Sequence, residues 1–554
     1  MSQKRLFRLL HRSNQRRMND SEGLQSAVRS TSIISVAIMV SRILGLVREQ
    51  VIAYFFGATV VTDAFYAAFR IPNLMRDLFG EGVLSKAFIT TFKMTEIEDG
   101  EDSAWQLSNR IFNGTALILF LLTLIGILVS PIIVDLMFMG KGFDVQLDHS
   151  RHFGFSNKRD LTVYLTRIMF PFLLLVSLAA IAMGILNSKG KFGVPAIASS
   201  FFNISTIIIG VSGYYLGPRA GFHPVTGLAV GILVGGGAQF LVQLPSMWYV
   251  GFRYQFIIGF KDKRVKQVCF LVIPAILGVA AVQINVLVNG MFASVGENWL
   301  SWIAWAFRLM HLPIGIFGVA ISTVALPNLA GLVAKGEIEE FRKSFSFALR
   351  LVFLLTIPAS VGLMVLSESI CQLIYGIGRN IGNTKPIAAA LFCYSFGLCG
   401  YSAVKVVTDG FYAFSDTKTP VKVSLLAVGL NIILNYFFIF ELGLEYRALA
   451  LSTSFTITLN FLLLLVLLHR KIGGLALNGI WFFLVRLMFA SAVMGISCWS
   501  ISLIIKNQMV IDSLTSRLLS VFLPMSTGLL ILLLMYKLLR VEELDQLLDS
   551  ILRR

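Results

Sequence analysis

Charged side chains are scarce in this chain of 554 residues, in which Asp, Glu, Lys and Arg together make up only 14%. Hydrophobic residues account for 56%, and the mean hydropathy is +0.78. Soluble domains of this size do not have such a composition, and the long apolar runs lack the period-two alternation of membrane β-barrel strands. The composition therefore predicts an all-α polytopic membrane protein.

Cysteine and histidine are also too rare or too scattered for several kinds of site. The five cysteines lie in or beside apolar runs without paired spacing, which argues against a disulfide framework or a metal site. The chain also lacks a Gly-x-x-x-x-Gly-Lys-Ser/Thr loop, a His-Glu-x-x-His motif and a Gly-x-Ser-x-Gly element. We therefore expect no cofactor, no metal, no catalytic residues and no ATP hydrolysis.

Acidic residues are fewer than basic ones, with 30 Asp and Glu against 47 Lys and Arg, and the formal net charge is +17. In a soluble protein this excess would suggest a nucleic-acid partner. Here much of it lies in the N-terminal tail and in loops between apolar runs, where the positive-inside rule places it. We therefore expect no nucleic-acid partner.

Apolar windows predict fourteen transmembrane helices with both termini on one side. The loop 251–267 and other loops of the same parity are basic and share a side with the basic tail, which is therefore predicted to be cytoplasmic. Two opposite-side loops are weak basic exceptions, which are the loop 138–159 and the loop that holds Arg379 and Lys385. The predicted spans are 31–56, 61–92, 109–137, 160–187, 193–216, 224–250, 268–293, 299–328, 341–370, 386–413, 419–440, 446–468, 479–505 and 514–540.

An internal repeat suggests how these spans are organised. The triplet Ala-Phe-Arg at 68–70 recurs at 306–308, 238 residues later, and Phe-Gly follows each triplet at the same spacing. We expect two six-helix pseudo-repeat lobes around a central cationic cavity, plus two extra C-terminal helices. The predicted segments are a basic cytoplasmic tail (1–29), an N-lobe (30–250), a basic cytoplasmic linker (251–267), a C-lobe (268–468), the extra helix pair (479–540) and a cytoplasmic amphipathic tail (541–554).

Two arginines lie inside the first predicted span, where a cation costs at least ~3 kcal/mol on insertion scales. Arg42, Gly45 and Arg48 are three residues apart and cover roughly 120° of one helix face over about 9 Å. Two guanidiniums with space between them suit a diphosphate, which arginine forks bind bidentately. Alternatively, Arg42 and Arg48 have a structural role, in which they snorkel to the membrane interface or pair with Glu49 and Asp63.

The second predicted span carries four more charged residues, which are Asp63, Arg70, Arg76 and Glu81. Pro72 is expected to break this helix, and broken helices that line a cavity expose backbone groups that bind ligands. A second interpretation makes Arg76 and Glu81 ordinary charged flanks at the cytoplasmic end.

Arg308, in the eighth predicted span, is the repeat counterpart of Arg70. Two lobes that each present an arginine to one cavity would form an anion clamp. We therefore expect an anionic substrate.

These charged motifs resemble the MurJ/MviN lipid II flippase family of the MOP exporter superfamily, over about residues 30–540. The motifs are 41–48 (SRILGLVR), 62–65 (TDAF), 72–76 (PNLMR), 79–82 (FGEG), 405–412 (KVVTDGFY) and 416–420 (DTKTP). The resemblance implies a V-shaped cavity for the diphosphate-sugar head of lipid II, an undecaprenyl-diphosphate-linked muropeptide. It also implies a groove on the last two spans, 479–540, for the polyprenyl tail.

The resemblance also implies roles for single residues. Family cavity arginines fall on Arg48, Arg76 and Arg308, with Arg42 also matching. An essential family aspartate falls on Asp63.

The family glutamate that follows the Pro-Asn-Leu block falls on Glu81. The chain departs from the family at Asp77, where relatives carry a second arginine, and at Phe307 and His311, which are acidic in some relatives.

We predict a flippase that moves this peptidoglycan precursor from the inner to the outer leaflet of the bacterial cytoplasmic membrane by alternating access. Its expected partners are lipid II, membrane lipids and the cell-wall synthesis machinery. Three alternatives remain: a flippase for another polyprenyl-diphosphate oligosaccharide, a membrane glycosyl- or phosphotransferase, and a cation-coupled drug exporter. The last of these should have an acidic cavity, which the charges here do not predict.

Overall fold

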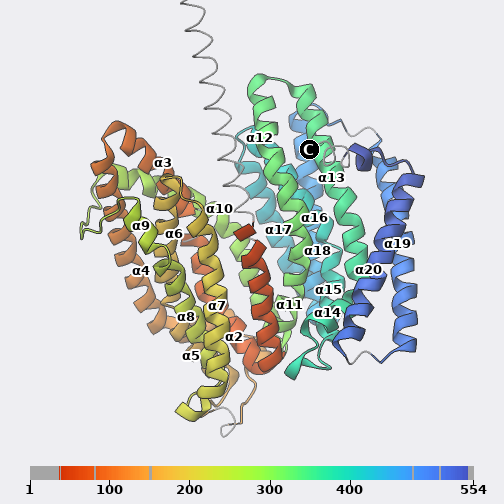
Figure 1. The fold of residues 1–554 in the computed structure, drawn as a ribbon, viewed down its shortest axis with the longest axis horizontal. Coiled ribbons are helices and arrows are strands. Elements are labelled where there is room, and N and C mark those ends of the chain that lie inside the picture. Colours follow the sequence, from red (N-terminus) through yellow and green to blue (C-terminus); the bar gives the residue numbers. More distant parts are fainter. Residues whose placement is uncertain are drawn as a thin grey trace, which may run out of the picture. The chain divides into compact units, whose positions relative to one another are not determined.

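The computed structural model describes residues 36–37, 39–79, 83–148, 153–476, 479–510 and 513–546. Within these ranges the chain is helical apart from its connections, and one isolated bridge between Gln146 and Asn157 is the only β feature. Figure 1 follows the helices from the red N-terminal to the blue C-terminal end. The predicted all-α class is confirmed.

Ten helical segments in the described part of the chain are long and apolar enough to cross a membrane. An eleventh is the pair α15 (Lys385–Ser395) and α16 (Leu398–Ala413), which is bent by 43°. All eleven coincide with predicted spans, so the chain is a multi-pass membrane protein. The other three predicted spans are also helical, at 36–37 with 39–55, at α2 (Val60–Phe79) with α3 (Val83–Glu98), and at α10 (Lys263–Ala293). The count of fourteen spans stays a prediction.

The prediction that Pro72 breaks the second span is wrong. Helix α2 runs from Val60 to Phe79 with Pro72 inside it. Proline removes one backbone hydrogen bond, but membrane helices tolerate this loss because neighbouring groups satisfy the freed carbonyl.

The first of two compact units comprises the described residues of Met1–Val51, Ala68–Ser130 and Val163–Ile276. Small residues bring two of its helices close together, since a Cβ atom on Gly213 would lie only 2.4 Å from the Cα atom of Gly227. The helices between Glu101 and Tyr249 are α4 (Glu101–Met137), α5 (Lys158–Met169), α6 (Phe172–Ser188), α7 (Gly193–Leu216), α8 (Thr226–Leu241) and α9 (Leu244–Tyr249).

The second unit comprises the described residues of Ile52–Ala67, Pro131–Thr162 and Leu277–Arg554. The segments 52–67 and 131–162 therefore belong with the C-terminal helices, although both fall in the predicted N-lobe. The later helices are α11 (Trp299–Pro313), η3 (Ile314–Gly318), α12 (Val319–Lys335), α13 (Ile338–Val365), α14 (Ser367–Tyr375), α17 (Lys418–Tyr436), η5 (Phe437–Glu441), α18 (Tyr446–Lys471), α19 (Ile480–Gln508) and α20 (Leu514–Leu538).

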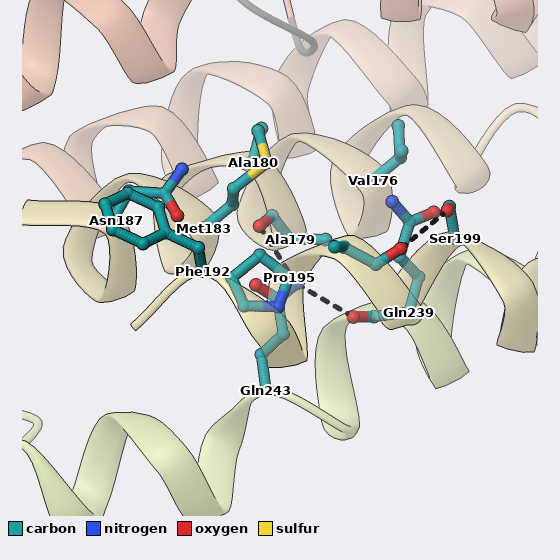
Figure 2. Close-up of a pocket in the computed structure, with 11 residues that line it drawn as sticks. Val176, Ala179, Ala180, Met183, Asn187, Phe192, Pro195, Ser199, Gln239 and Gln243 are labelled. Carbon is teal, nitrogen blue, oxygen red and sulfur yellow. Dashed lines mark hydrogen bonds between the residues drawn. The ribbon is translucent and has the colours of Figure 1, made fainter. Parts of the chain in front are cut away.

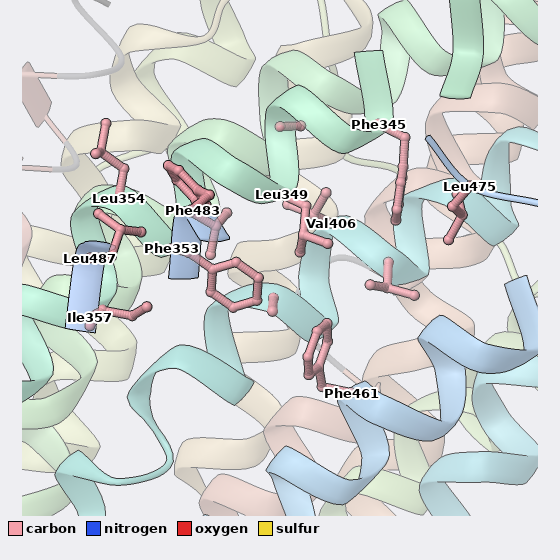
Figure 3. Packing of buried hydrophobic residues seen from close by; sticks show 14 of the residues in the cluster. Phe345, Leu349, Phe353, Leu354, Ile357, Val406, Phe461, Leu475, Phe483 and Leu487 are labelled. Carbon is pink, nitrogen blue, oxygen red and sulfur yellow. The ribbon is translucent and has the colours of Figure 1, made fainter. Parts of the chain in front are cut away.

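A large apolar core holds the C-terminal helices together (Figure 3). Phe345 and Phe353 of α13 pack in it with Phe461 of α18. Phe483 and Leu487 of α19 belong to the same core, so the extra helix pair is built into the second unit. Because lipid tails are as apolar as these side chains, the core stabilises the helix packing through van der Waals contact and not through removal of apolar surface from water.

The predicted C-terminal tail begins as a short helix at 542–546. Glu543 is buried, and its carboxylate accepts a hydrogen bond from Arg350 of α13 at 2.6 Å. This start of the tail therefore packs against α13. The remaining tail, 547–554, and the predicted N-terminal tail, 1–29, lie outside the described residues.

Candidate functional site

The two arginines of the first helix lie in different environments. Arg48 is buried, its Nη2 donates to Glu49 Oε1 at 2.7 Å, and its guanidinium lies over the Phe202 ring at 5.4 Å. Arg42 is exposed. Of the structural partners considered for Arg48, Glu49 is the one that it contacts, whereas Asp63 is paired elsewhere.

Polar contacts attach the start of this helix to α7. Ser199 Oγ donates to Ser41 Oγ at 3.0 Å, and Asn203 Nδ2 donates to the Ser41 carbonyl at 3.2 Å. Because Ser41 precedes Arg42, these bonds fix the backbone beside the exposed cation.

Arg76 of α2 is neutralised by its neighbour in sequence. Its Nη2 and Nε atoms donate to the same oxygen of Asp77, at 2.9 and 3.2 Å. Asp77 is one of the positions where the chain departs from the pattern that the resemblance implies, and it pairs directly with Arg76. Arg70, in the same helix, is half-buried, and Glu81 lies outside the described residues.

Arg308 lies half-buried in α11, beside the two other departures. The ring centroids of Phe307 and His311 are 4.3 Å apart. The Phe307 centroid also lies 5.3 Å from that of Tyr394 and 6.1 Å from that of Tyr401. Residues in place of the family acids therefore build an aromatic surface next to Arg308.

Among the predicted site residues that the structure describes, Asp63 lies in the most completely buried polar cluster. Its Oδ2 accepts from Lys158 Nζ at 2.8 Å, and its Oδ1 accepts from the backbone N–H and the hydroxyl of Ser301, both at 2.7 Å. Lys158 also donates to the Gly142 carbonyl at 2.9 Å and lies 4.0 Å from the Phe143 ring centre. Both charged side chains are fully buried, and such a pair persists only where further hydrogen bonds complete it.

Tight backbone packing surrounds this cluster within the second unit. A Cβ atom on Gly140 would lie 2.4 Å from the Ser294 backbone, so only glycine fits there. Five residues before Asp63 in the chain, the Ala58 N–H donates to Asn380 Oδ1 at 3.0 Å. These contacts place the segment before Asp63 against Asn380 and the segment before Lys158 against the residues that precede α11.

Sequence reasoning missed Lys158 and Ser301. Lys158 lies in the predicted loop 138–159, 95 residues from Asp63, and no local pattern connects the two. Ser301 had a signal that went unused: it lies 238 residues after Asp63, the same offset that relates Arg70 to Arg308.

A second polar network, of neutral side chains, lies among α10, α17 and α18. Asn435 Nδ2 donates to Asn289 Oδ1 at 2.8 Å and to Asn431 Oδ1 at 3.0 Å, and the Ser452 hydroxyl donates to Asn435 Oδ1. Asn431 and Asn435 are four residues apart and so share one face of α17, but no local pattern connects them with Asn289, 146 residues from Asn435. In the ranges that the structure describes, no cluster of three or more His, Cys, Asp or Glu side chains could hold a metal ion.

Known proteins resemble this chain in sequence over most of its length. The family model described as lipid II flippase MurJ matches residues 52–520. A probable lipid II flippase MurJ of Vibrio cholerae is 34% identical over 478 residues, which cover 86% of this chain and 89% of that protein. The lipid II flippase MurJ of Burkholderia cenocepacia is 34% identical over 481 residues, 85% of this chain and 89% of that protein.

Solved structures show the same likeness. A lipid II flippase MurJ in an inward closed conformation aligns with a TM-score of 0.72 at 25% identity, covering 94% of this chain and 99% of that one. An inward-facing multidrug resistance MATE transporter of the MOP superfamily aligns with a TM-score of 0.65, covering 80% and 98%. At 12% identity, this second match concerns the fold alone.

Proposed function

The chain belongs to the MurJ family of lipid II flippases, and from this premise we propose that it moves lipid II from the inner to the outer leaflet of the bacterial cytoplasmic membrane. The family match over residues 52–520 carries the proposal. In this reading the protein is a transporter without catalytic residues, both termini are cytoplasmic, and lipid II, membrane lipids and the cell-wall synthesis machinery are its partners.

We assign the diphosphate of the head group to the arginines. Arg48 and Arg76 each pair with the carboxylate of the next residue in the chain. A diphosphate carries more negative charge than a single carboxylate and accepts bidentate bonds, so it can displace these internal partners. The proposed contacts, each made at some stage of the transport cycle, are Arg42, Arg48, Arg70, Arg76 and Arg308, with Glu81 as an acidic neighbour.

Asp63 has a different role in this proposal. Its carboxylate is fully buried and has three hydrogen-bond donors, so it has no surface to offer to a substrate in this conformation. The loops around it share the predicted extracytoplasmic side. We propose that the Asp63–Lys158–Ser301 cluster is a latch that separates when the head group leaves toward the outer leaflet and re-forms afterwards.

The polyprenyl tail is assigned to the surface of α19 and α20, which lie against each other (Figure 1). Leu529, Leu530 and Leu534 of α20 are exposed, while Leu532 and Tyr536 are buried in the core. An apolar surface open to lipid lets the tail stay out of a cavity lined by arginine, where it would desolvate the cations.

The driving force follows from charge. An anionic head neutralises the arginines and thereby favours closure around it. The membrane potential, positive outside, helps an empty cationic site to return, since each charge that crosses 100 mV gains about 2.3 kcal/mol.

Depletion of the protein in its host tests the proposal. We expect lipid II to accumulate while the fraction that an impermeant outer-leaflet probe can reach falls. Unchanged outer-leaflet lipid II in depleted cells would contradict it. Loss of another polyprenyl-diphosphate oligosaccharide from the outer leaflet would favour the second flippase reading, and a change in head-group mass would favour a transferase.

A further inference from the structure

A groove in the second unit is lined by residues of α14, α15 and α18, two of which are cations. Lys385 and Arg447 lie in its wall together with Glu368 and the exposed ring of Phe392, and we call it the cationic groove. Its volume of about 430 Å³ is within the range of small-molecule sites, about 300–1,000 Å³. By contrast, the cavity among α6, α7 and α8 in the first unit has no charged side chain in its lining (Figure 2).

The positions of the two cations are electrostatically unfavourable. Both lie on the side predicted to be extracytoplasmic, where the positive-inside rule disfavours them. Lys385 is the first residue of α15 and Arg447 the second residue of α18, so each lies at the positive end of a helix dipole. An anion in the groove would be attracted by both side chains and would offset both unfavourable charges.

The one carboxylate in the wall of the groove is paired with a cation from outside it. Lys506 of α19 donates a hydrogen bond to Glu368 Oε2. Lys385 is exposed and has no hydrogen bond or ion pair with another described residue. Arg447 is also exposed, with its guanidinium 5.8 Å from the Tyr446 ring centre, and Glu445 is its acidic neighbour in the chain. The groove therefore offers two accessible cations, of which only Arg447 has a carboxylate beside it in the chain.

Helix α14 connects the cationic groove to α19 and α20. Glu368, near its start, pairs with Lys506 near the end of α19, and the carbonyl of Gly376, just after its end, accepts a hydrogen bond from Arg517 of α20. The polyprenyl tail is assigned above to the surface of α19 and α20. Because the diphosphate is bonded directly to the tail, a lipid on that surface would carry its diphosphate near this groove.

We propose that the cationic groove is a second anion site, which holds the diphosphate of the lipid on the outer-leaflet side after it leaves the arginines of the proposed transport site. This refinement rests on the proposed function. Arg447 forms a bidentate fork with one phosphate, and Lys385 provides a point charge for the other. A phospholipid carries a single phosphodiester and would neutralise only one of the two cations, so the groove favours a diphosphate. Phe392, in the same wall, packs against the first isoprene units of the tail.

A photoreactive side chain in the groove tests the proposal. The full-length protein with Phe392→benzoylphenylalanine is placed in phosphatidylcholine nanodiscs and irradiated with undecaprenyl diphosphate, or with undecaprenol, which lacks the phosphates. We expect the diphosphate lipid to crosslink. The added double substitution Lys385→Gln with Arg447→Gln should lower this yield by about tenfold, because charge-assisted hydrogen bonds from two cations are lost. Undecaprenol should crosslink weakly and equally in both proteins.

A second measurement needs no substitution in the groove. Undecaprenyl diphosphate should protect Lys385 of the unmodified protein from an impermeant amine reagent, whereas undecaprenol should not. Lys141→Gln with Arg219→Gln is the matched control for the crosslink, since it removes two exposed cations from the same predicted side. It should change the yield less than about twofold, because exposed charges outside the groove are screened by salt.

Equal crosslinking with and without the two groove cations would overturn the inference. So would complete suppression of the crosslink by phosphatidylglycerol nanodiscs, which would show a general phospholipid site. The proposed function is measured separately, by flipping of lipid II in proteoliposomes. Flipping without crosslinking or protection of Lys385 would overturn the inference alone, whereas failure of the unmodified protein to flip lipid II would overturn the proposed function and the inference with it.

Discussion

Asp63 Oδ1 accepts two hydrogen bonds from Ser301, one from the backbone N–H and one from the hydroxyl, both at 2.7 Å. Ser301 is the third residue of α11, and the N-cap residue Asn298 makes no side-chain capping hydrogen bond. Asp63 therefore caps α11 from another helix, satisfying a free N–H and placing negative charge at the positive end of the helix dipole. Lys158 balances that charge from the other side.

The first prediction concerns this latch. Asp63→Asn should destabilise the protein by about 3–5 kcal/mol, because it leaves the Lys158 ammonium buried without a counter-charge. Thermal unfolding of the purified protein measures the loss. The double variant Asp63→Asn with Lys158→Met should recover part of it, since no unpaired charge remains. If Asp63→Asn unfolded at the same temperature as the wild type, the buried ion pair with Lys158 would not stabilise the protein, and the proposed latch would be refuted.

The second prediction concerns the arginines. Arg48→Ala and Arg308→Ala should each abolish complementation of a flippase-deficient strain while membrane insertion is preserved. Lysine at either position should rescue poorly, because an ammonium cannot form the bidentate fork. Arg219→Ala, in the exposed turn η2 (Pro218–Ala220), is the control and should complement fully. Full activity of both site variants would rule out the diphosphate role.

A substitution at Asp77 should strengthen substrate binding, in contrast with the arginine substitutions. Asp77→Asn removes a carboxylate that pairs with Arg76, so a diphosphate no longer has to displace this carboxylate. The pair is partly exposed and such pairs contribute about 0.2–1 kcal/mol, so affinity for lipid II should rise up to about fivefold. Titration in nanodiscs measures the change. Arg76→Ala should lower the affinity, and weaker binding by Asp77→Asn would show that Arg76 does not meet the substrate.

Asp416, in the turn before α17, makes stability depend on acid pH. The hydrogen bond from Lys471 at 2.5 Å, with further bonds from Thr419, lowers the pKa of Asp416 to about 2, from an ordinary value of 3.8. A depressed pKa stabilises the fold at pH values above the unfolded pKa, and this contribution is lost as the pH falls from about 4 through 2.

The unfolding temperatures of the wild type and Asp416→Asn, compared from pH 7 to pH 2, test this relationship. The difference should be constant down to about pH 4 and vanish near pH 2. It should correspond to less than about 1 kcal/mol because the pair is partly exposed and screened by salt. A difference that persists at pH 2 would show that the ion pair is not its source.

Topology is the fifth prediction. In a Cys269→Ser background, which removes the exposed native cysteine among the described residues, Asp144→Cys should label from outside with an impermeant thiol reagent. Lys261→Cys, in the basic loop before α10, should label only after permeabilisation. The reverse pattern would invert the assigned orientation.

Much of this fold follows from the sequence alone. Hydropathy and the lengths of apolar runs are local properties, so they predicted an all-α membrane protein and eleven segments that the structure also finds suited to cross a membrane. The motifs likewise placed Arg48, Arg76 and Arg308 among the residues of interest. The carboxylates that pair with Arg48 and Arg76 belong to the next residues in the chain, so sequence reasoning could reach them.

Only the tertiary structure decided which distant groups meet. Asp63 pairs with Lys158, 95 residues away, and not with an arginine of its own or the preceding helix, because packing of separate segments brings that ammonium to it. Phe483 of α19 likewise joins the core of α13, which no apolar pattern could assign. The same holds for Lys385 and Arg447, which come from separate helices and line one groove because α15 packs against α18. Hydropathy specifies that a segment is buried in the membrane, but side-chain partners depend on helix packing, which is a property of the whole chain.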